Sequence, residues 1–246
     1  MANTFLEILS AYLLGDLARQ LLMEIDGVKR NRLMAVGQPV SSALLAALFI
    51  GQWHWPIIAA VFATSLLINL ARELPCSEDF WFFAADKALH LMAIAMLAVA
   101  LFPTAVADGR WITALQPDTW NWACQGLVLV SGLILCVPLG GALLGKAMTP
   151  LTAQIDKKKI DGLTNGGRYI GWLERLLIFL FILMGSLEGV GFLLGAKSIL
   201  RFGEIKEQED RKVTEYIIIG TFFSFGWGIL AAELTRRALE LWSSSQ

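Results

Sequence analysis

Apolar stretches close to 20 residues long recur along this chain, separated by shorter polar segments. A helix that crosses the bilayer core needs about 20 mostly apolar residues, with a range of about 17 to 25. Backbone amides in lipid must bond within their own segment, and no alternation of period two runs through these stretches, so each is predicted to be a helix. Eight segments fit the pattern: residues 4–25, 34–50, 55–71, 80–102, 120–144, 169–185, 187–200 and 216–234.

The pattern therefore predicts an all-α, polytopic transmembrane helix bundle with about eight spans. The first segment is interrupted by Glu7, Asp16 and Arg19, and if it lies on the membrane surface the number of spans becomes seven. Pro138 is expected to kink the segment 120–144. Three parts are predicted: an N-terminal four-helix half (1–102), the fifth span with its flanking loops (103–168), and a C-terminal three-helix unit with a cytoplasmic loop (169–246).

Composition agrees with a membrane location. Charged residues make up 17% of the chain and hydrophobic residues 56%, with a mean hydropathy of +0.60; a typical soluble domain carries about 25% charged residues. The net charge of −1 argues against a nucleic-acid partner, which requires a basic surface. We therefore expect the lipid bilayer to be the main partner.

The placement of lysine and arginine predicts the orientation, because cytoplasmic loops carry an excess of both. With the N-terminus outside, most of the 20 lysines and arginines fall in cytoplasmic loops, above all in 145–168 and 197–215. The prediction is a multi-pass protein of the cell membrane (inner or plasma membrane) without a removable signal peptide. The same loops are compatible with binding of anionic lipid headgroups or of a protein partner. The spacing of Gly141 and Gly145 is compatible with a homo-oligomer.

Ionisable side chains occur within the predicted spans, where each costs roughly 2.5 to 3.5 kcal/mol and is expected to face a partner or water. Asp86 and His90 are four residues apart and share one helix face, so a histidine that titrates near neutral pH lies beside a carboxylate. One interpretation is a polar centre for proton relay, ion passage or acid–base work, and the other is an ion-paired latch between helices. The members of this intramembrane polar centre are Asp16, Arg19, Gln20, Asp86, Lys87 and His90.

A second set of charged residues is predicted at the cytoplasmic boundary. Arginine matches phosphate geometry with paired donors, so a pocket for a lipid headgroup or a small anion is one interpretation. Ordinary pairing at helix ends, with long side chains reaching the interface, is the other. The set comprises Arg168, Glu174, Arg175, Lys197, Arg201, Glu204 and Glu215.

Motifs that would define a reaction are not found in the sequence. It contains no P-loop, no G-x-S-x-G string and no H-E-x-x-H string, so catalytic residues are not assigned and an enzymatic activity is left open. The three cysteines form no C-x-x-C pair and the chain has two histidines, so neither a metal site nor another cofactor is predicted.

Five strings carry a resemblance: LLGDLARQ (13–20), DKALHL (86–91), GRYIGWLERLL, GFLLGAKSILRFGEIK and TEYIIIGTFFSFGWG. They resemble a family of bacterial multi-pass membrane proteins that is catalogued as a domain of unknown function. That family has a histidine before its Leu-Leu-Gly-Asp string, where this chain has Tyr12, and an aspartate-glutamine pair where this chain has Asp86 and Lys87. The resemblance implies a bacterial inner-membrane location and no particular activity.

Three functions remain as hypotheses. The first is movement of a small solute or ion through a polar path between the first and fourth spans. The second is a membrane-embedded enzyme that acts on lipid headgroups at the cytoplasmic boundary. The third is a non-catalytic partner or effector subunit that docks another protein through the loop 197–215. Transport is ranked first, although no internal repeat of the kind common in transporters is found.

Overall fold

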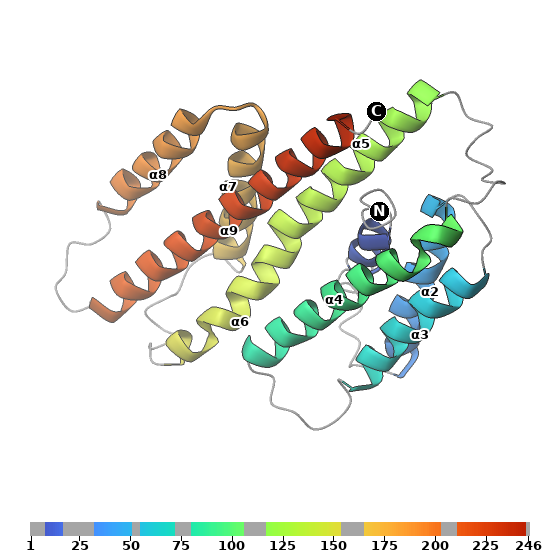
Figure 1. Ribbon diagram of the computed structural model, residues 1–246. Helices are drawn as coiled ribbons and strands as arrows, with labels where there is room; N and C mark the ends of the chain where they lie inside the picture. Colours follow the sequence, from blue (N-terminus) through green and yellow to red (C-terminus); the bar gives the residue numbers. More distant parts are fainter. Residues whose placement is uncertain are drawn as a thin grey trace. The chain divides into compact units, whose positions relative to one another are not determined.

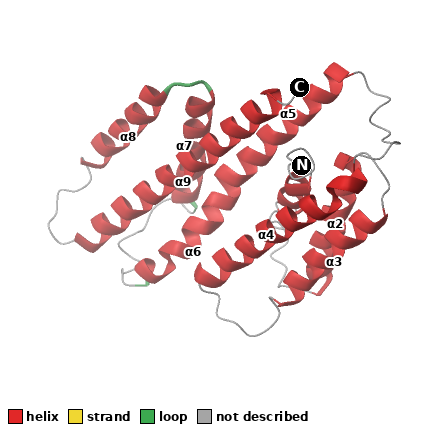
Figure 2. Ribbon diagram, in the orientation of Figure 1, coloured by secondary structure: helices red, strands yellow, loops and turns green. Residues whose placement is uncertain are grey.

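The regular elements in the described part of this computed structural model are all helices (Figure 1; Figure 2). The structure describes residues 8–16, 32–50, 55–71, 80–105, 117–153, 165–202 and 211–244. The predicted all-α class is confirmed over these residues. After a helical segment at 8–16, the elements are α2 (Arg32–Ile50), α3 (Trp55–Ala71), α4 (Phe80–Ala105), α5 (Pro117–Ile134), η2 (Leu135–Leu139), α6 (Gly140–Thr152), α7 (Gly166–Leu183), α8 (Leu187–Phe202) and α9 (Arg211–Ser244).

The first helices follow the apolar segments closely, whereas α6 continues to Thr152, beyond the predicted end at residue 144 and into the predicted loop 145–168. Helix α3 begins and ends at the predicted residues, and α2 and α4 extend beyond theirs by two or three residues at one end. Helix α9 is longer than expected, because the polar tail after residue 234 continues the same helix to Ser244. Arg236 and Arg237 both donate to Glu233 at helical spacing, and such pairs stabilise a helix.

The segment between α5 and α6 contains an irregular turn. A five-residue π-helical turn, η2, includes Pro138, where the sequence predicts a distortion. Proline has no backbone N–H and therefore disrupts regular α-helical bonding. The indole Nε1 of Trp227 on α9 donates to the carbonyl oxygen of Leu135 at 3.0 Å, and this bond ties the turn to α9.

The chain forms two compact units. Unit 1 comprises Met1–Ile134 and Leu239–Gln246, and unit 2 comprises Leu135–Ala238. In unit 1, α3 packs against α2 and α4; in unit 2, α7 packs against η2, α6 and α8. The core of unit 2 is formed by Cys136, Ile178, Phe179, Ile182, Val190, Phe225, Ala231 and Ala232. The three-part division expected from the sequence stays a prediction.

Two described helices are long and apolar enough to cross a bilayer: Trp122–Thr152 and Lys212–Ser243. This criterion uses length and composition alone, and a core helix of a soluble protein also meets it. Within the part of the chain that the structure describes, no further helix meets it. A membrane location is therefore supported in outline, while the multi-pass arrangement with eight spans stays a prediction.

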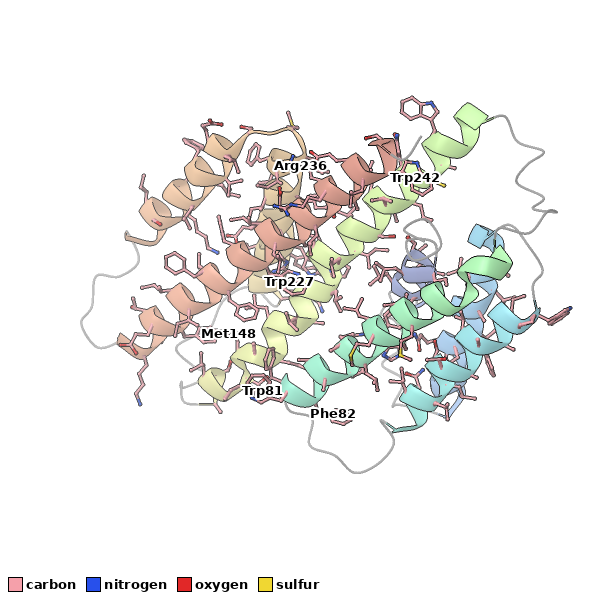
Figure 3. The ribbon with its side chains drawn as sticks, in the orientation of Figure 1. Trp81, Phe82, Met148, Trp227, Arg236 and Trp242 are labelled. Atoms are coloured by element: carbon pink, nitrogen blue, oxygen red, sulfur yellow. The ribbon has the colours of Figure 1, made fainter. Side chains whose placement is uncertain are left out.

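Large apolar side chains point outward in both units. Trp81 is 79% exposed and Met96 is 73% exposed on α4, and Phe192 is 79% exposed on α8; Trp81 is labelled in Figure 3. Charged side chains lie inside, with Asp16 at 3% and Arg175 at 2% exposure. Such groups are rarely buried in soluble proteins unless they are paired; Asp16 is paired with Lys87, whereas Arg175 has no ion pair among the described residues.

Candidate functional site

Unit 1 contains a buried ion pair between the N-terminal helical segment and α4. Lys87 Nζ lies 2.6 Å from Asp16 Oδ2, and both side chains are largely shielded from solvent. The same ammonium donates to the Tyr12 hydroxyl oxygen at 3.2 Å. Polar residues of the first and fourth predicted segments are thus in direct contact. Gly15 allows the close approach of this segment to α2, because a Cβ there would overlap the Ser42 hydroxyl.

His90 lies one helical turn beyond Asp86 on α4, as its spacing in the sequence indicates. Its Nδ1 is 2.9 Å from the carbonyl oxygen of Asp86 and 3.6 Å from the Oδ1 atom of the same residue. A carbonyl oxygen only accepts hydrogen bonds, so the hydrogen is assigned to Nδ1. The imidazole stacks on the Tyr12 ring with 4.6 Å between centroids.

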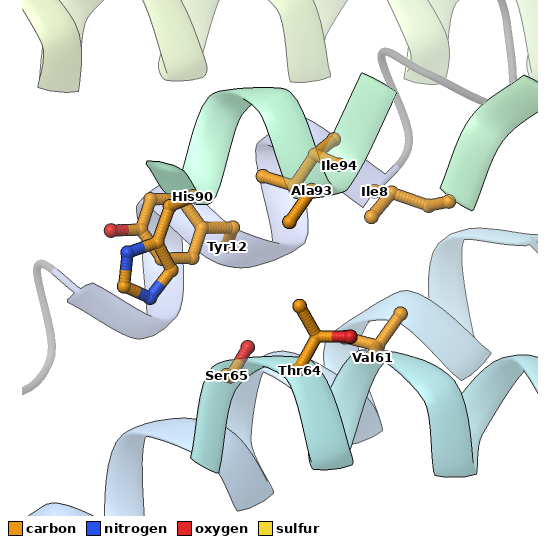
Figure 4. A pocket seen from close by; sticks show the side chains of 8 residues that line it. All are labelled: Ile8, Tyr12, Val61, Thr64, Ser65, His90, Ala93 and Ile94. Atoms are coloured by element: carbon orange, nitrogen blue, oxygen red, sulfur yellow. The ribbon is translucent and has the colours of Figure 1, made fainter. Parts of the chain in front are cut away.

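The space beside His90 is small. A cavity of about 10 Å³ lies between the N-terminal segment, α3 and α4, which is close to the minimum that one water molecule requires. Figure 4 shows the His90 and Tyr12 rings together on one side and Thr64 and Ser65 of α3 on the other. The described residues here enclose room for about one water. Arg19 and Gln20, the remaining predicted members of this centre, lie outside the described residues.

Unit 2 contains a much larger pocket, of about 450 Å³, bordered by α6, α7, α8 and α9. One part of its lining is apolar and consists of Leu144, Met148, Ile170 and Ile217; Met148 is labelled in Figure 3. The polar residues of the lining are Thr152, Arg168, Glu174, Arg175, Lys197, Tyr216, Thr221 and Ser224. Pockets that hold small molecules or cofactors typically measure about 300 to 1,000 Å³, so this volume suits a ligand larger than a simple ion.

Arg175 is the central charged group of this pocket and is only 2% exposed. Its Nη1 donates to the Ser224 hydroxyl oxygen at 3.0 Å, and its buried Nε has no hydrogen-bond partner. Among the residues that the structure describes, no carboxylate forms an ion pair with this guanidinium. A buried charge without a counter-ion is strongly unfavourable, so an anion that enters the pocket would remove a penalty already present in the fold.

The nearest acidic residue along the chain, Glu174, is paired elsewhere. Lys197 Nζ on α8 donates to Glu174 Oε2 at 2.7 Å. Consecutive positions on a helix do not face each other, which explains why Glu174 reaches α8 and Arg175 reaches α9. Lys197 also lies over the Phe225 ring at 5.6 Å. The pair Glu174–Lys197 therefore connects α7 to α8, and among the described residues Arg175 has no carboxylate in direct contact.

Glycines make room for the guanidinium. A Cβ at Gly141 would lie 3.1 Å from Arg175 Nη2 and 3.1 Å from Trp172 Nε1, and a Cβ at Gly171 would lie 3.4 Å from Arg175 Nη1. At Gly145, also in the pocket lining, a Cβ would meet nothing within 4 Å. Of this pair of glycines, Gly141 borders the guanidinium and Gly145 does not.

Arg168 lies at the exposed end of the pocket, in the first turn of α7. Its guanidinium carbon is 5.8 Å from the centroid of the Tyr169 ring and 5.4 Å from that of the Trp172 ring. The turn before it is formed by Asn165, whose φ of 64° is left-handed and whose carbonyl accepts the backbone N–H of Arg168 at 3.0 Å. Asparagine tolerates this conformation better than most residues.

Four of the seven residues predicted at the boundary line this pocket: Arg168, Glu174, Arg175 and Lys197. Glu215 is exposed on α9 and does not belong to the lining. The side chain of Arg201, in α8, and the whole of Glu204 lie outside the described residues.

The polar residues of α9 in this pocket were missed by sequence reasoning. Tyr216, Thr221 and Ser224 line it, and Ser224 accepts from Arg175. Thr221 and Ser224 are three residues apart, so they fall on one face of an otherwise apolar helix, and this spacing was the available signal. A search of the described residues for three or more His, Cys, Asp or Glu side chains able to hold a metal ion finds no such group.

Comparison of the chain with family models, with curated proteins and with solved structures finds no match. The resemblance to a bacterial membrane-protein family therefore stays a prediction.

Proposed function

We propose that the chain is a multi-pass integral membrane protein with its N-terminus outside. Support comes from the outward-facing apolar side chains, the buried charges and the two helices that meet the length and hydropathy criterion. Lysine and arginine placement supports the orientation.

Cysteine labelling tests this topology. In a variant without the three native cysteines, Arg110→Cys should react with a membrane-impermeant maleimide in intact cells. Lys158→Cys should react only after the cells are permeabilised. Equal labelling of both positions in intact cells would contradict the proposed orientation.

We further propose that unit 2 binds the phosphate-bearing headgroup of a lipid, with Arg175 as the main phosphate ligand. The observation that carries this proposal is a guanidinium with 2% exposure, without a described carboxylate partner, in a pocket of about 450 Å³. Guanidinium groups bind phosphate through paired, parallel hydrogen bonds. The Ser224 hydroxyl accepts from Nη1 and orients the group.

The lining favours an amphipathic ligand over a free ion. Inorganic phosphate needs only polar contacts, whereas Leu144, Met148, Ile170 and Ile217 add an apolar surface to the same pocket. A lipid would place its phosphate at Arg175 and the start of an acyl chain along these residues, whose contact with water would thereby be reduced.

The decisive experiment measures binding of dihexanoyl phosphatidic acid, glycerol 3-phosphate and inorganic phosphate to the protein in detergent, by calorimetry. We expect the short-chain lipid to bind at least about tenfold more tightly than either soluble phosphate. Arg175→Gln should remove binding of all three, and Arg175→Lys should weaken it about tenfold because the paired geometry is lost.

Arg237→Gln is the matched control. It removes one arginine from the same unit at a position on α9 where the side chain is 68% exposed and paired with Glu233. Affinity should be unchanged in this variant. Equal losses in Arg237→Gln and Arg175→Gln would indicate a general charge effect and would contradict a site at Arg175.

Headgroup chemistry and solute movement are alternative functions. If the protein hydrolyses or transfers the bound lipid, a reaction product will be detected in the same samples. The pocket would then be an active site. Movement of a solute through unit 1 has less support, because the cavity between the described residues there measures about 10 Å³. The partner-subunit hypothesis depends on the loop 197–215, of which residues 203–210 are not described.

A further inference from the structure

This inference rests on the proposed phosphate site and concerns the chemistry of its ligand. A carboxylate is an unexpected neighbour for a bound phosphate, yet Glu174 lines the same pocket as Arg175. Its side chain is 10% exposed, so it is largely shielded from water. Two like charges brought together in a poorly hydrated space repel each other strongly. A ligand that carries only negative charge would gain nothing from Glu174, whose cationic partner among the described residues is Lys197.

Glu174 retains capacity to accept hydrogen bonds. Lys197 binds its Oε2 atom, and no described residue donates to Oε1. Oε1 also retains some solvent exposure, since the fully buried polar atoms without a partner do not include it. An ionised carboxylate accepts at both oxygens, so an incoming ammonium can bind Oε1 while Lys197 stays in place.

The two opposite charges are close along the chain. Glu174 and Arg175 are consecutive residues of α7, so their Cα atoms are about 3.8 Å apart, and both side chains border one pocket. Both groups border the same pocket, so one ligand that carries a phosphate and an ammonium can contact the two of them. Lys197 lies over the Phe225 ring and is paired with the Glu174 carboxylate. It is therefore not a free second cation for the phosphate.

We infer that the pocket binds an aminoalkyl phosphate, with the phosphate on Arg175 and the primary ammonium on Glu174 Oε1. The ligand class comprises zwitterionic lipids whose headgroup ends in a primary amine and the soluble aminoalkyl phosphate itself. The apolar lining favours the lipid, and the experiment separates the two sources.

The test compares ligands that differ only in the amine. Dihexanoyl phosphatidylethanolamine is measured against dihexanoyl phosphatidylethanol, and phosphoethanolamine against ethyl phosphate, by calorimetry on the full chain in detergent. We expect the aminated member of each pair to bind about tenfold more tightly, since a charge-assisted hydrogen bond is added. Tighter binding of the lipids than of the soluble pair would identify a lipid ligand, and equal binding would identify the free phosphate.

Glu174→Gln should abolish the preference for the amine and leave binding of phosphatidylethanol intact or stronger. Lys197→Met, which leaves Glu174 free for the ligand, should preserve or increase the preference. Glu188→Gln, at an exposed position on α8, is the control that removes a negative charge elsewhere in unit 2 and should change nothing.

The outcomes separate the inference from the proposed function. Wild-type protein that binds both members of a pair equally overturns the inference and leaves the phosphate site standing, and this result needs no variant. Equal losses for both ligands in Glu174→Gln also overturn it, because Glu174 would then act only by holding Lys197. Failure of every phosphate ligand to bind overturns the proposed function itself.

Discussion

Lys87 in unit 1 and Arg175 in unit 2 are both cations removed from water, yet their surroundings differ. Lys87 Nζ has a carboxylate at 2.6 Å and a phenol oxygen at 3.2 Å. Arg175 has a neutral hydroxyl at 3.0 Å and a buried Nε atom without a partner. The cavity in the first region measures about 10 Å³ and the pocket in the second about 450 Å³.

The difference distinguishes a structural charge from one that is available to a ligand. In unit 1 the opposite charge is supplied by the chain, and the volume suits no more than about one water. In unit 2 the Glu174 carboxylate forms its ion pair with Lys197, and Arg175 is left beside a large pocket without an ion pair among the described residues. The contacts therefore favour a helix-fixing latch at Asp16–Lys87 and a binding site at Arg175.

The largest expected effect is on the stability of unit 1. Lys87→Met leaves the Asp16 carboxylate buried without its cation and should lower the free energy of unfolding by about 3 to 5 kcal/mol. Unfolding by sodium dodecyl sulfate in mixed micelles, followed by tryptophan fluorescence, measures this change. The cycle of Lys87→Met, Asp16→Asn and the double variant should give a coupling energy above about 1 kcal/mol. A coupling near zero would contradict the latch.

Arg175→Met should behave in the opposite way, although Arg175 is more completely buried than Lys87. Replacement of a poorly compensated buried charge by an apolar side chain of similar size is often neutral or stabilising. We expect the stability of the ligand-free protein to fall by less than about 1 kcal/mol or to rise, while phosphate binding is lost. A loss of stability as large as that of Lys87→Met would remove the distinction between the two regions.

The sequence predicted the helices well and the pairing of charges poorly. The length of each apolar run determines where a helix can begin and end, which is why α3 matches its predicted bounds. The high cost of burying charge identifies Asp16 and Lys87 from the sequence alone. The match between arginine and phosphate geometry identifies the boundary set that includes Glu174 and Arg175. The number of spans stays a prediction, since it depends on the lipid as well as on the chain.

The tertiary structure determines which buried cation has a counter-ion. Glu174 and Arg175 are neighbours in sequence, and only the positions of α8 and α9 send one to Lys197 and the other to Ser224. Similarly, Gly141 and Gly145 have the same spacing as a packing motif, but only Gly141 borders the guanidinium. The spacing of residues along a helix shows which of them share a face. It does not show which element packs against that face.

The two glycines provide a smaller and more selective perturbation of the Arg175 pocket. Gly141→Ala should weaken phosphate binding about tenfold, because its Cβ would lie 3.1 Å from Arg175 Nη2 and overpacking displaces the guanidinium. Gly145→Ala on the same helix has open space and should leave affinity unchanged. Both substitutions raise helix propensity equally, so calorimetry on the pair isolates the steric effect. Equal affinities in the two variants would place the phosphate away from Arg175.

The smallest effect on phosphate binding is expected at Arg168. This residue allows an exposed cation to be compared with the buried Arg175 within one pocket. Its guanidinium is exposed and lies over two aromatic rings, so water and salt screen its attraction for a phosphate. Arg168→Gln should therefore weaken binding only about threefold and reduce the dependence of affinity on ionic strength. Arg175 is shielded from salt by burial, and the salt dependence that remains in Arg168→Gln should be small. If Arg168→Gln instead abolished binding while Arg175→Gln did not, the phosphate would sit at the exposed end of the pocket, and burial of Arg175 would carry no functional meaning.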